Sequence, residues 1–180
     1  SKKFFNIWTI VTNQRKNLLF SLLALTYTIH RSKERPPREG ASSKYPSYGK
    51  EEQKMEKELN KLLADLVVEY HKLQSFHWYL KGYHFFDDHA KLEEYYDAIA
   101  EAVDTVAEDM LMLGFKPEST MKGFMALSTI EEAKNKEVTS EEAYTEVLKD
   151  FKYLLDEVKS VKALAEKDNV YVTSNLMDDY

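Results

Sequence analysis

The chain has 180 residues, of which 43% are hydrophobic, and it contains no cysteine, which excludes disulfide frameworks, zinc–thiolate sites and thiol catalysis. Only five Gly and four Pro argue against an all-β fold with many turns. The net charge of −6 is unevenly distributed, because residues 1–50 carry ten Lys/Arg and two Glu. We therefore divide the chain into a basic N-terminal extension and linker, 1–50, and an acidic body, 51–180.

The first thirty residues are mostly apolar with scattered Lys and Arg, and their longest near-continuous apolar run, 18–27, is too short to span a bilayer. The run resembles the core of a signal peptide, but no convincing cleavage site follows it. Apolar residues between 4 and 25 share one helical face, which predicts an amphipathic helix that docks on a protein or membrane surface. Residues 31–50 hold three of the four prolines and predict a linker or mobile tail.

The body begins with two expected long helices. Apolar residues repeat every three to four positions between 59 and 76, which predicts a helix from Glu51 to about Leu80. Gly82 breaks the pattern. A second helix is expected from about Asp88 to Leu113, with Gly114 at its end.

Three further elements are predicted towards the C-terminus. Residues 119–130 suggest a short helix within a connection. Thr139 and Glu142 have the spacing of a capping box, which predicts the start of a third long helix that ends near Lys167. Thr173 can cap a last helix of about one and a half turns before the sequence ends.

The stretch 76–94 collects three of the five histidines among acids and aromatic residues. At 100° per residue, His89, Glu93, Asp104 and Glu108 share an arc of roughly 100° on one side of the second helix. His77 lies near the end of the preceding helix and can reach towards this arc. These side chains are of the types that bind first-row transition metals.

The spacing of these ligands predicts that two chains share each site. Glu93 and Asp104 are roughly 16 Å apart along a straight helix, which is too far for one metal ion. An antiparallel two-fold contact would place the 89/93 end of one helix opposite the 104/108 end of its mate, twice. We therefore predict His77, His89, Glu93, Asp104 and Glu108 as the metal ligands and catalytic residues of an inter-subunit centre.

The mixed nitrogen and oxygen ligands suit iron, manganese or zinc. Iron is favoured because Trp78, Tyr79 and Tyr83 crowd the region, and aromatic rings near an oxidising metal can take up stray electrons. The same rings could equally serve packing. No Glu-x-x-His motif occurs in the chain, which disfavours a metal centre inside a single bundle.

The segments HWYLKG (77–82), HAKLEEYYD (89–97), VDTVAED (103–109) and LGFKPEST (113–120) resemble the Dps family, the DNA-binding proteins from starved cells. The resemblance covers about residues 55–178. It implies an all-α, ferritin-like four-helix bundle with a short helix in the connection between the second and third helices. It also implies a hollow homododecamer.

The resemblance further implies a ferroxidase that oxidises Fe(II), preferably with hydrogen peroxide, and stores the ferric mineral, which protects DNA from oxidative damage. The five predicted ligands match the register of the family's ferroxidase centre, with Glu93 where the family often has Asp. His77, His89 and Glu93 would come from one subunit and the other two ligands from its mate. Glu166 and Asp168 match the region where the family lines its three-fold pores with acids, although a solvated helix end is an equal alternative.

Family members usually continue beyond the equivalent of Tyr180, so the last helix is expected to be truncated and to leave an apolar groove that residues 4–27 could fill. The basic extension suggests sequence-independent DNA binding, against the simpler alternative of a solubilising linker. The alternative function is an architectural protein that compacts DNA or docks on a membrane through residues 1–50. The expected location is the cytoplasm, associated with the nucleoid.

Overall fold

The computed structural model describes residues 49–180, and all of these except 112–114 belong to one compact unit, which is described here. The predicted N-terminal helix, its docking on the bundle and nearly all of the extension lie outside the described residues. Those expectations, and the domain boundary at residue 50, therefore stay predictions.

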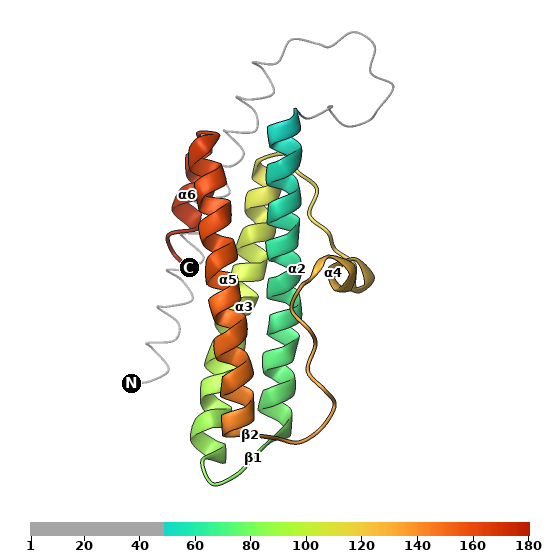
Figure 1. Ribbon diagram of the computed structural model, residues 1–180, viewed down its shortest axis with the longest axis vertical. Coiled ribbons are helices and arrows are strands. Elements are labelled where there is room, and N and C mark those ends of the chain that lie inside the picture. The colour runs from blue at the N-terminus through green and yellow to red at the C-terminus, as the bar shows by residue number, and fades with distance from the viewer. Residues whose placement is uncertain (1–48) are drawn as a thin grey trace, which may run out of the picture. The chain divides into compact units, whose positions relative to one another are not determined.

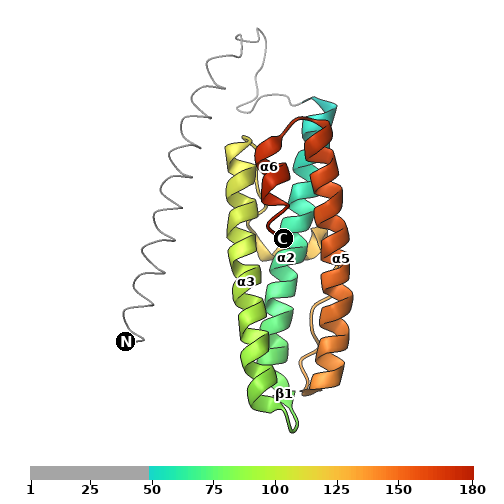
Figure 2. The same cartoon turned by 90° about the vertical axis from the view of Figure 1, so that its left-hand side faces the viewer.

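The described part of the chain contains five helices. They are α2 (Lys50–Tyr79), α3 (Phe85–Met112), α4 (Met121–Leu127), α5 (Ser140–Lys167) and α6 (Tyr171–Leu176). The helices α2, α3 and α5 lie side by side along the long axis, and α4 lies beside α2, outside the bundle (Figure 1). The short α6 turns back along α5 and lies between α3 and α5 at one end (Figure 2).

The connectivity is that of a ferritin-like bundle. The helices α2 and α3 form an antiparallel hairpin, and the long connection that carries α4 returns the chain so that α5 runs parallel to α3 (Figure 1). This arrangement confirms the predicted all-α four-helix fold with a short helix in the connection. The fourth helix, α6, has six residues, as short as the sequence led us to expect.

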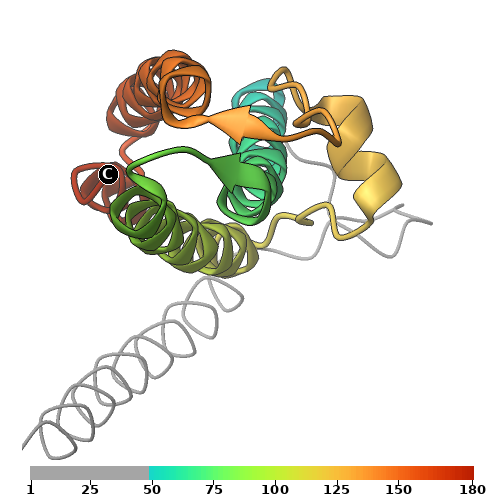
Figure 3. The ribbon, with the colours of Figure 1, turned by 90° about the horizontal axis from the view of Figure 1, so that it is seen from below.

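Two short strands join the ends of helices at the base of the bundle. They are β1 (Leu80–Lys81) and β2 (Val138–Thr139), which pair in parallel, with Leu80 opposite Val138 (Figure 3). Lys81 also forms an ion pair of 2.7 Å with Glu137. The pairing ties the end of α2 to the start of α5. It was not predicted, because a two-residue strand is too short to produce a hydrophobic alternation.

The core follows from the helical spacing of the apolar residues, which places one face of each long helix inside. At the base, the buried residues come from α2, α3, α5 and both strands. They are Leu73, Phe76, Leu80, Leu92, Val138, Ala143 and Val147. Each fully buried leucine contributes about 1.5–3 kcal/mol relative to an exposed one.

Most helix boundaries match the predictions, and two do not. The capping box is confirmed, since Thr139 N–H donates to the Glu142 carboxylate at 2.9 Å and Glu142 N–H donates to the Thr139 hydroxyl at 3.3 Å. The predicted start of α3 at Asp88 is wrong by three residues, because Phe85 packs against the core and begins the helix there. The predicted cap at Thr173 is also wrong, since Val170 occupies that position.

A buried carboxylate anchors the connection between α3 and α5. One oxygen of Asp65, on α2, accepts hydrogen bonds from the Ser128 hydroxyl (2.7 Å), Thr129 N–H (2.6 Å) and Ile130 N–H (2.9 Å). Its other oxygen pairs with the Lys61 ammonium at 3.1 Å. Burial alone would raise the pKa of Asp65, but these donors outweigh it and hold the pKa below the ordinary value.

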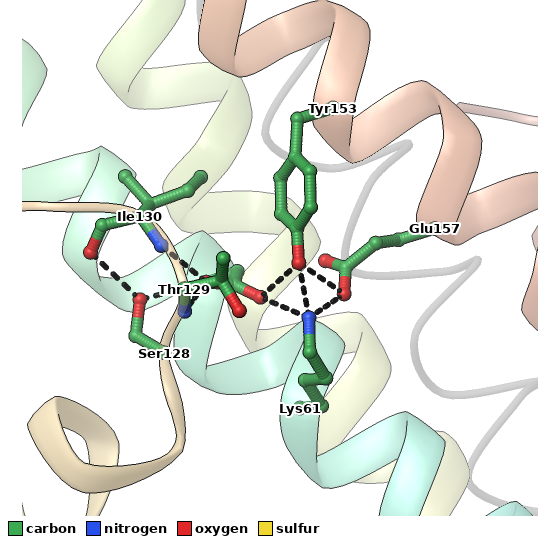
Figure 4. A network of polar contacts seen from close by, with 7 residues as sticks. Lys61, Ser128, Thr129, Ile130, Tyr153 and Glu157 are labelled. Atoms are coloured by element: carbon green, nitrogen blue, oxygen red, sulfur yellow. Dashed lines mark hydrogen bonds and ion pairs between the residues drawn. The ribbon is translucent and has the colours of Figure 1, made fainter.

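The same network reaches α5. The Lys61 ammonium contacts both the Tyr153 hydroxyl and the Glu157 carboxylate, and the hydroxyl donates to Glu157 at 2.9 Å (Figure 4). Burial raises the pKa of Glu157 despite the neighbouring ammonium. One lysine and one aspartate therefore connect α2, α5 and the segment after α4.

Candidate metal centre

Two of the predicted ligands lie in contact where α2 meets α3. His77 is in the last turn of α2 and is only 8% exposed, while His89 is half-buried in the second turn of α3. The turn between the helices contains Gly82 at φ 129°, a backbone conformation that disfavours other residues. The turn reverses the chain, and the two imidazoles stack with ring centroids 3.5 Å apart and an interplanar angle of 20°.

Reciprocal hydrogen bonds fix the protonation pattern of both rings. The Nδ1 atom of His77 lies 2.8 Å from the carbonyl oxygen of His89, and Nδ1 of His89 lies 2.8 Å from the carbonyl oxygen of His77. A carbonyl oxygen can only accept, so each Nδ1 must carry the proton and donate. In the neutral imidazole, Nε2 then keeps its lone pair, which is the form that binds metals.

Aromatic residues hold this pair in place. Phe85 stacks on His89 at 4.9 Å, and Tyr96 meets the His77 ring edge-on at 5.3 Å. Tyr70 in turn packs edge-on against Tyr96 at 6.0 Å. Burial, together with the negative charges of Glu93 and Asp97, raises the pKa of the Tyr96 hydroxyl. The imidazoles therefore have little freedom to rotate away from this arrangement.

The predicted acidic ligands lie on the exposed side of α3. Glu93 is one turn beyond His89, and Asp104 and Glu108 lie in the other half of the helix. Because α3 is continuous, the 15 residues from His89 to Asp104 span roughly 22 Å. Within residues 49–180, no three His, Asp or Glu side chains gather in a way that could hold a metal ion. One chain thus brings together the two histidines, but none of the three predicted acidic ligands forms a metal-binding group with them.

The aromatic neighbours differ from those that the sequence suggested. Trp78 is 59% exposed and Tyr83 is 97% exposed, whereas Phe85 and Tyr96 contact the histidines directly. The helical spacing contained a signal for both, since they lie four residues before and seven residues after His89. Trp78 instead packs edge-on against His71 at 6.0 Å, and Tyr83 packs edge-on against His84 at 5.2 Å.

Comparison with known proteins places the chain in a family. Residues 56–180 match the family described as a ferritin-like domain. The DNA protection during starvation protein 2 of Bacillus anthracis is 40% identical over 119 residues, which cover 66% of this chain and 81% of that protein. The chain belongs to the ferritin-like Dps family.

Further Dps relatives agree in sequence and in structure. The DNA protection during starvation protein of Helicobacter pylori is 35% identical over 121 residues, covering 67% of this chain and 84% of that protein. The crystal structure of a Dps protein from Bacillus brevis superposes with a TM-score of 0.71 at 32% identity, covering 74% of this chain and 89% of that chain. A Vibrio cholerae Dps structure, described as a member of the ferritin-like diiron-carboxylate superfamily, gives 0.71 at 28% identity, with coverage of 78% and 90%.

A membrane-spanning element is not found in the described region of this Dps chain. None of the helices between residues 49 and 180 is both long enough and apolar enough to cross a bilayer.

Proposed function

We propose that this protein stores and detoxifies iron as a ferroxidase of the Dps type. Fe(II) is oxidised at centres formed between two copies of the chain, and the ferric product is kept inside a dodecameric shell. The observation that carries the proposal is the histidine pair, in which both Nδ1 atoms are hydrogen-bonded and both Nε2 atoms keep a lone pair for a metal. The Dps relatives and the diiron-carboxylate description of the Vibrio structure support it.

The ligand roles follow the spacing along α3. His77, His89 and Glu93 would bind iron from one subunit, and Asp104 and Glu108 would complete the site from its mate. Nitrogen and carboxylate ligands together suit Fe(II), and the carboxylates stabilise the extra positive charge of Fe(III). Because α3 carries His89 and Glu93 in one half and Asp104 and Glu108 in the other, an antiparallel two-fold contact gives two equivalent centres.

Hydrogen peroxide is the proposed oxidant. One peroxide accepts two electrons, one from each of two Fe(II) ions, its O–O bond breaks, and both oxygen atoms end in water or hydroxide. Hydrolysis of the two Fe(III) ions then yields ferric oxyhydroxide and releases protons. This two-electron route consumes iron and peroxide without forming hydroxyl radicals, which is how the protein would protect DNA.

A subunit-mixing experiment tests the shared site. The double variants His77→Ala/His89→Ala and Asp104→Ala/Glu108→Ala should each lose peroxide-dependent Fe(II) oxidation, followed by the absorbance of the ferric product. When the two variants are reassembled together at equal ratio, half of the two-fold contacts join unlike chains. Each such contact regains one of its two centres, the one that combines the intact histidines of one chain with the intact acids of the other. About a quarter of the wild-type rate should therefore return.

The mixture also provides the decisive contrary result. If the mixed particle stays inactive while each variant retains a mass near 250 kDa, twelve times the 21.1 kDa chain, the centre is not shared between subunits. A matched control is His71→Ala, which removes an exposed histidine outside the site and should leave the rate unchanged. If His71→Ala were as inactive as the double variants, the site would be misplaced.

A second proposed activity is sequence-independent DNA binding through residues 1–50, which would place the protein at the nucleoid in the cytoplasm. The distribution of charge supports the assignment to this segment. Residues 51–180 carry fifteen Lys and twenty-nine Asp/Glu, so they repel phosphate, and DNA contact is left to the basic residues 1–50. Deleting residues 1–50 should abolish DNA retardation, and binding by the full chain should weaken steeply with salt. Retardation that survives both changes would refute this role. Retention of the full chain by anionic vesicles but not by DNA would favour the membrane-docking alternative.

A further inference from the structure

The segment 171–180 has few buried residues. We call this segment the flap; it begins with α6, which lies between α3 and α5 at one end of the bundle (Figure 2). Three of its residues are buried, namely Thr173, Ser174 and Met177. A helix of six residues is too short to be stable by itself, and Val170 at its N-cap provides no side-chain hydrogen bond. The flap therefore depends on a small number of tertiary contacts.

The strongest of these contacts is a buried hydrogen bond to α3. The Thr173 hydroxyl donates to the carboxyl group of Asp109 at 2.7 Å, and neither residue has exposed surface. The other oxygen of Asp109 has no hydrogen-bond partner among the described residues. A buried polar atom without a partner lowers stability, and movement of the flap would let water reach this oxygen. The closed arrangement thus carries a cost that opening relieves.

The contacts of the flap at the surface are weaker. The Lys162 ammonium contacts the Asp178 carboxylate of the flap, and the Ser174 hydroxyl donates to Glu166 at 3.5 Å. Lys162 also lies 3.9 Å from Glu166, one turn further along α5, so it keeps an acidic neighbour when the flap moves away. Exposed ion pairs contribute little to stability, because water and salt compete for both charges. These contacts therefore offer little resistance to opening.

The turn between α5 and α6 does not depend on the flap. Val170 N–H donates to the Ala165 carbonyl at 2.8 Å, so the end of α5 is capped by the turn itself. Asn169 within this turn has φ 59°, a left-handed conformation that asparagine adopts more readily than most residues. A change of backbone angles at this turn can therefore move the flap without unwinding α5.

We propose that the flap opens by itself, before the bundle unfolds, with the Thr173–Asp109 hydrogen bond as its latch and the turn at Asn169 as its hinge. Opening separates the Thr173 hydroxyl from Asp109, exposes Met177 and gives water access to the side of α3 that α6 covers. Local opening is expected where a segment has few buried apolar contacts. The inference does not rest on the metal centre, and its test uses no iron.

The absence of cysteine from the chain makes thiol labelling a specific test of opening. Met177→Cys introduces a thiol in the flap at a position that is 3% exposed, and Leu73→Cys introduces one in the core at the base of the bundle. Both full-length proteins are treated with an excess of an aromatic disulfide reagent at increasing urea concentrations. Met177→Cys should react about tenfold faster or more without urea. Its rate should depend less on urea, because opening the flap exposes less surface than unfolding the bundle.

A second substitution tests the latch. Thr173→Val keeps the shape of the side chain but removes the hydroxyl. In the Met177→Cys protein it should raise the labelling rate about tenfold or more, as expected for the loss of a hydrogen bond to a carboxyl group. The matched control is Thr145→Val, which removes an exposed hydroxyl from α5 and should change the rate by less than about threefold.

Equal labelling rates with equal urea dependence at the two cysteine positions would overturn the proposal, because the flap would then open only with the whole bundle. No acceleration by Thr173→Val, or an equal acceleration by Thr145→Val, would also overturn it. If a flap variant does not fold, hydrogen exchange of the unsubstituted chain provides the same contrast. Amides of residues 173–178 should exchange ahead of those of residues 66–76 in α2, and simultaneous exchange would overturn the proposal.

Discussion

Replacing Asp65 with Ala is the most direct test of how the bundle holds the connection that carries α4. The substitution removes the acceptor of the Ile130 N–H, whose hydrogen bond is buried, and it takes one partner from Lys61. A buried donor that loses its acceptor costs about 1–3 kcal/mol, and because three donors lose the same oxygen while Lys61 keeps Glu157 as a partner, the expected total is about 3 kcal/mol. For a chain of this size the expected fall in Tm is roughly 10 °C.

The assay is urea unfolding followed by circular dichroism at one fixed chain concentration, because assembly would make the free energy of unfolding depend on concentration. Ser128→Ala removes one of the three donors to the same oxygen of Asp65 and should cost only about 1 kcal/mol. Asp156→Ala removes an exposed acid from α5 and should stay within about 0.5 kcal/mol of the wild type. A loss below about 1 kcal/mol for Asp65→Ala would refute the anchoring role.

Three further predictions concern stability, all measured by unfolding at fixed chain concentration. Burial raises the pKa of Asp109 to about 6, above its unfolded value, so ionisation of this carboxyl should lower the free energy of unfolding as pH rises from about 4 to 7. Asp109→Asn should therefore flatten the dependence of Tm on pH in that range. An unchanged dependence of Tm on pH contradicts this. Leu73→Ala should lower the free energy of unfolding by about 2–5 kcal/mol because Leu73 is fully buried, whereas Leu148→Ala should lower it by under about 0.5 kcal/mol because Leu148 is exposed. Equal losses for the two variants would contradict this. Thr139→Ala should cost about 1 kcal/mol through the lost cap of α5, and no change would show that the cap is dispensable.

Elements with strong local signals could be predicted from the sequence. The helix predicted from Glu51 to about Leu80 lies within one residue of α2 at each end, and the Thr139–Glu142 pair defines the start of α5. The start of α3 could not be located in this way. It depends on Phe85 packing against residues of α2 and α5, and such tertiary contacts leave no trace in local spacing.

The candidate site was predictable in part, for the same physical reason. Helical spacing groups His89 with Glu93, and the chain reversal at Gly82 brings His77 close. The reciprocal bonds to backbone carbonyls depend on the register of two helices, which no motif encodes. Thr173 resembled a helix cap, but its hydroxyl donates to the buried Asp109 at 2.7 Å, a partner 64 residues away.

The parallel pairing of Leu80 with Val138 has a consequence for engineering the chain. This pairing holds the end of the segment that connects α3 to α5, and Asp65 holds the same segment at residues 128–130 through hydrogen bonds. Only residues 131–137 lie between these two points of attachment, and most of them are exposed. A peptide tag or fluorophore inserted near Lys134 would therefore extend from the surface without pulling on either helix, whereas the same insertion at Thr129 would loosen the whole connection.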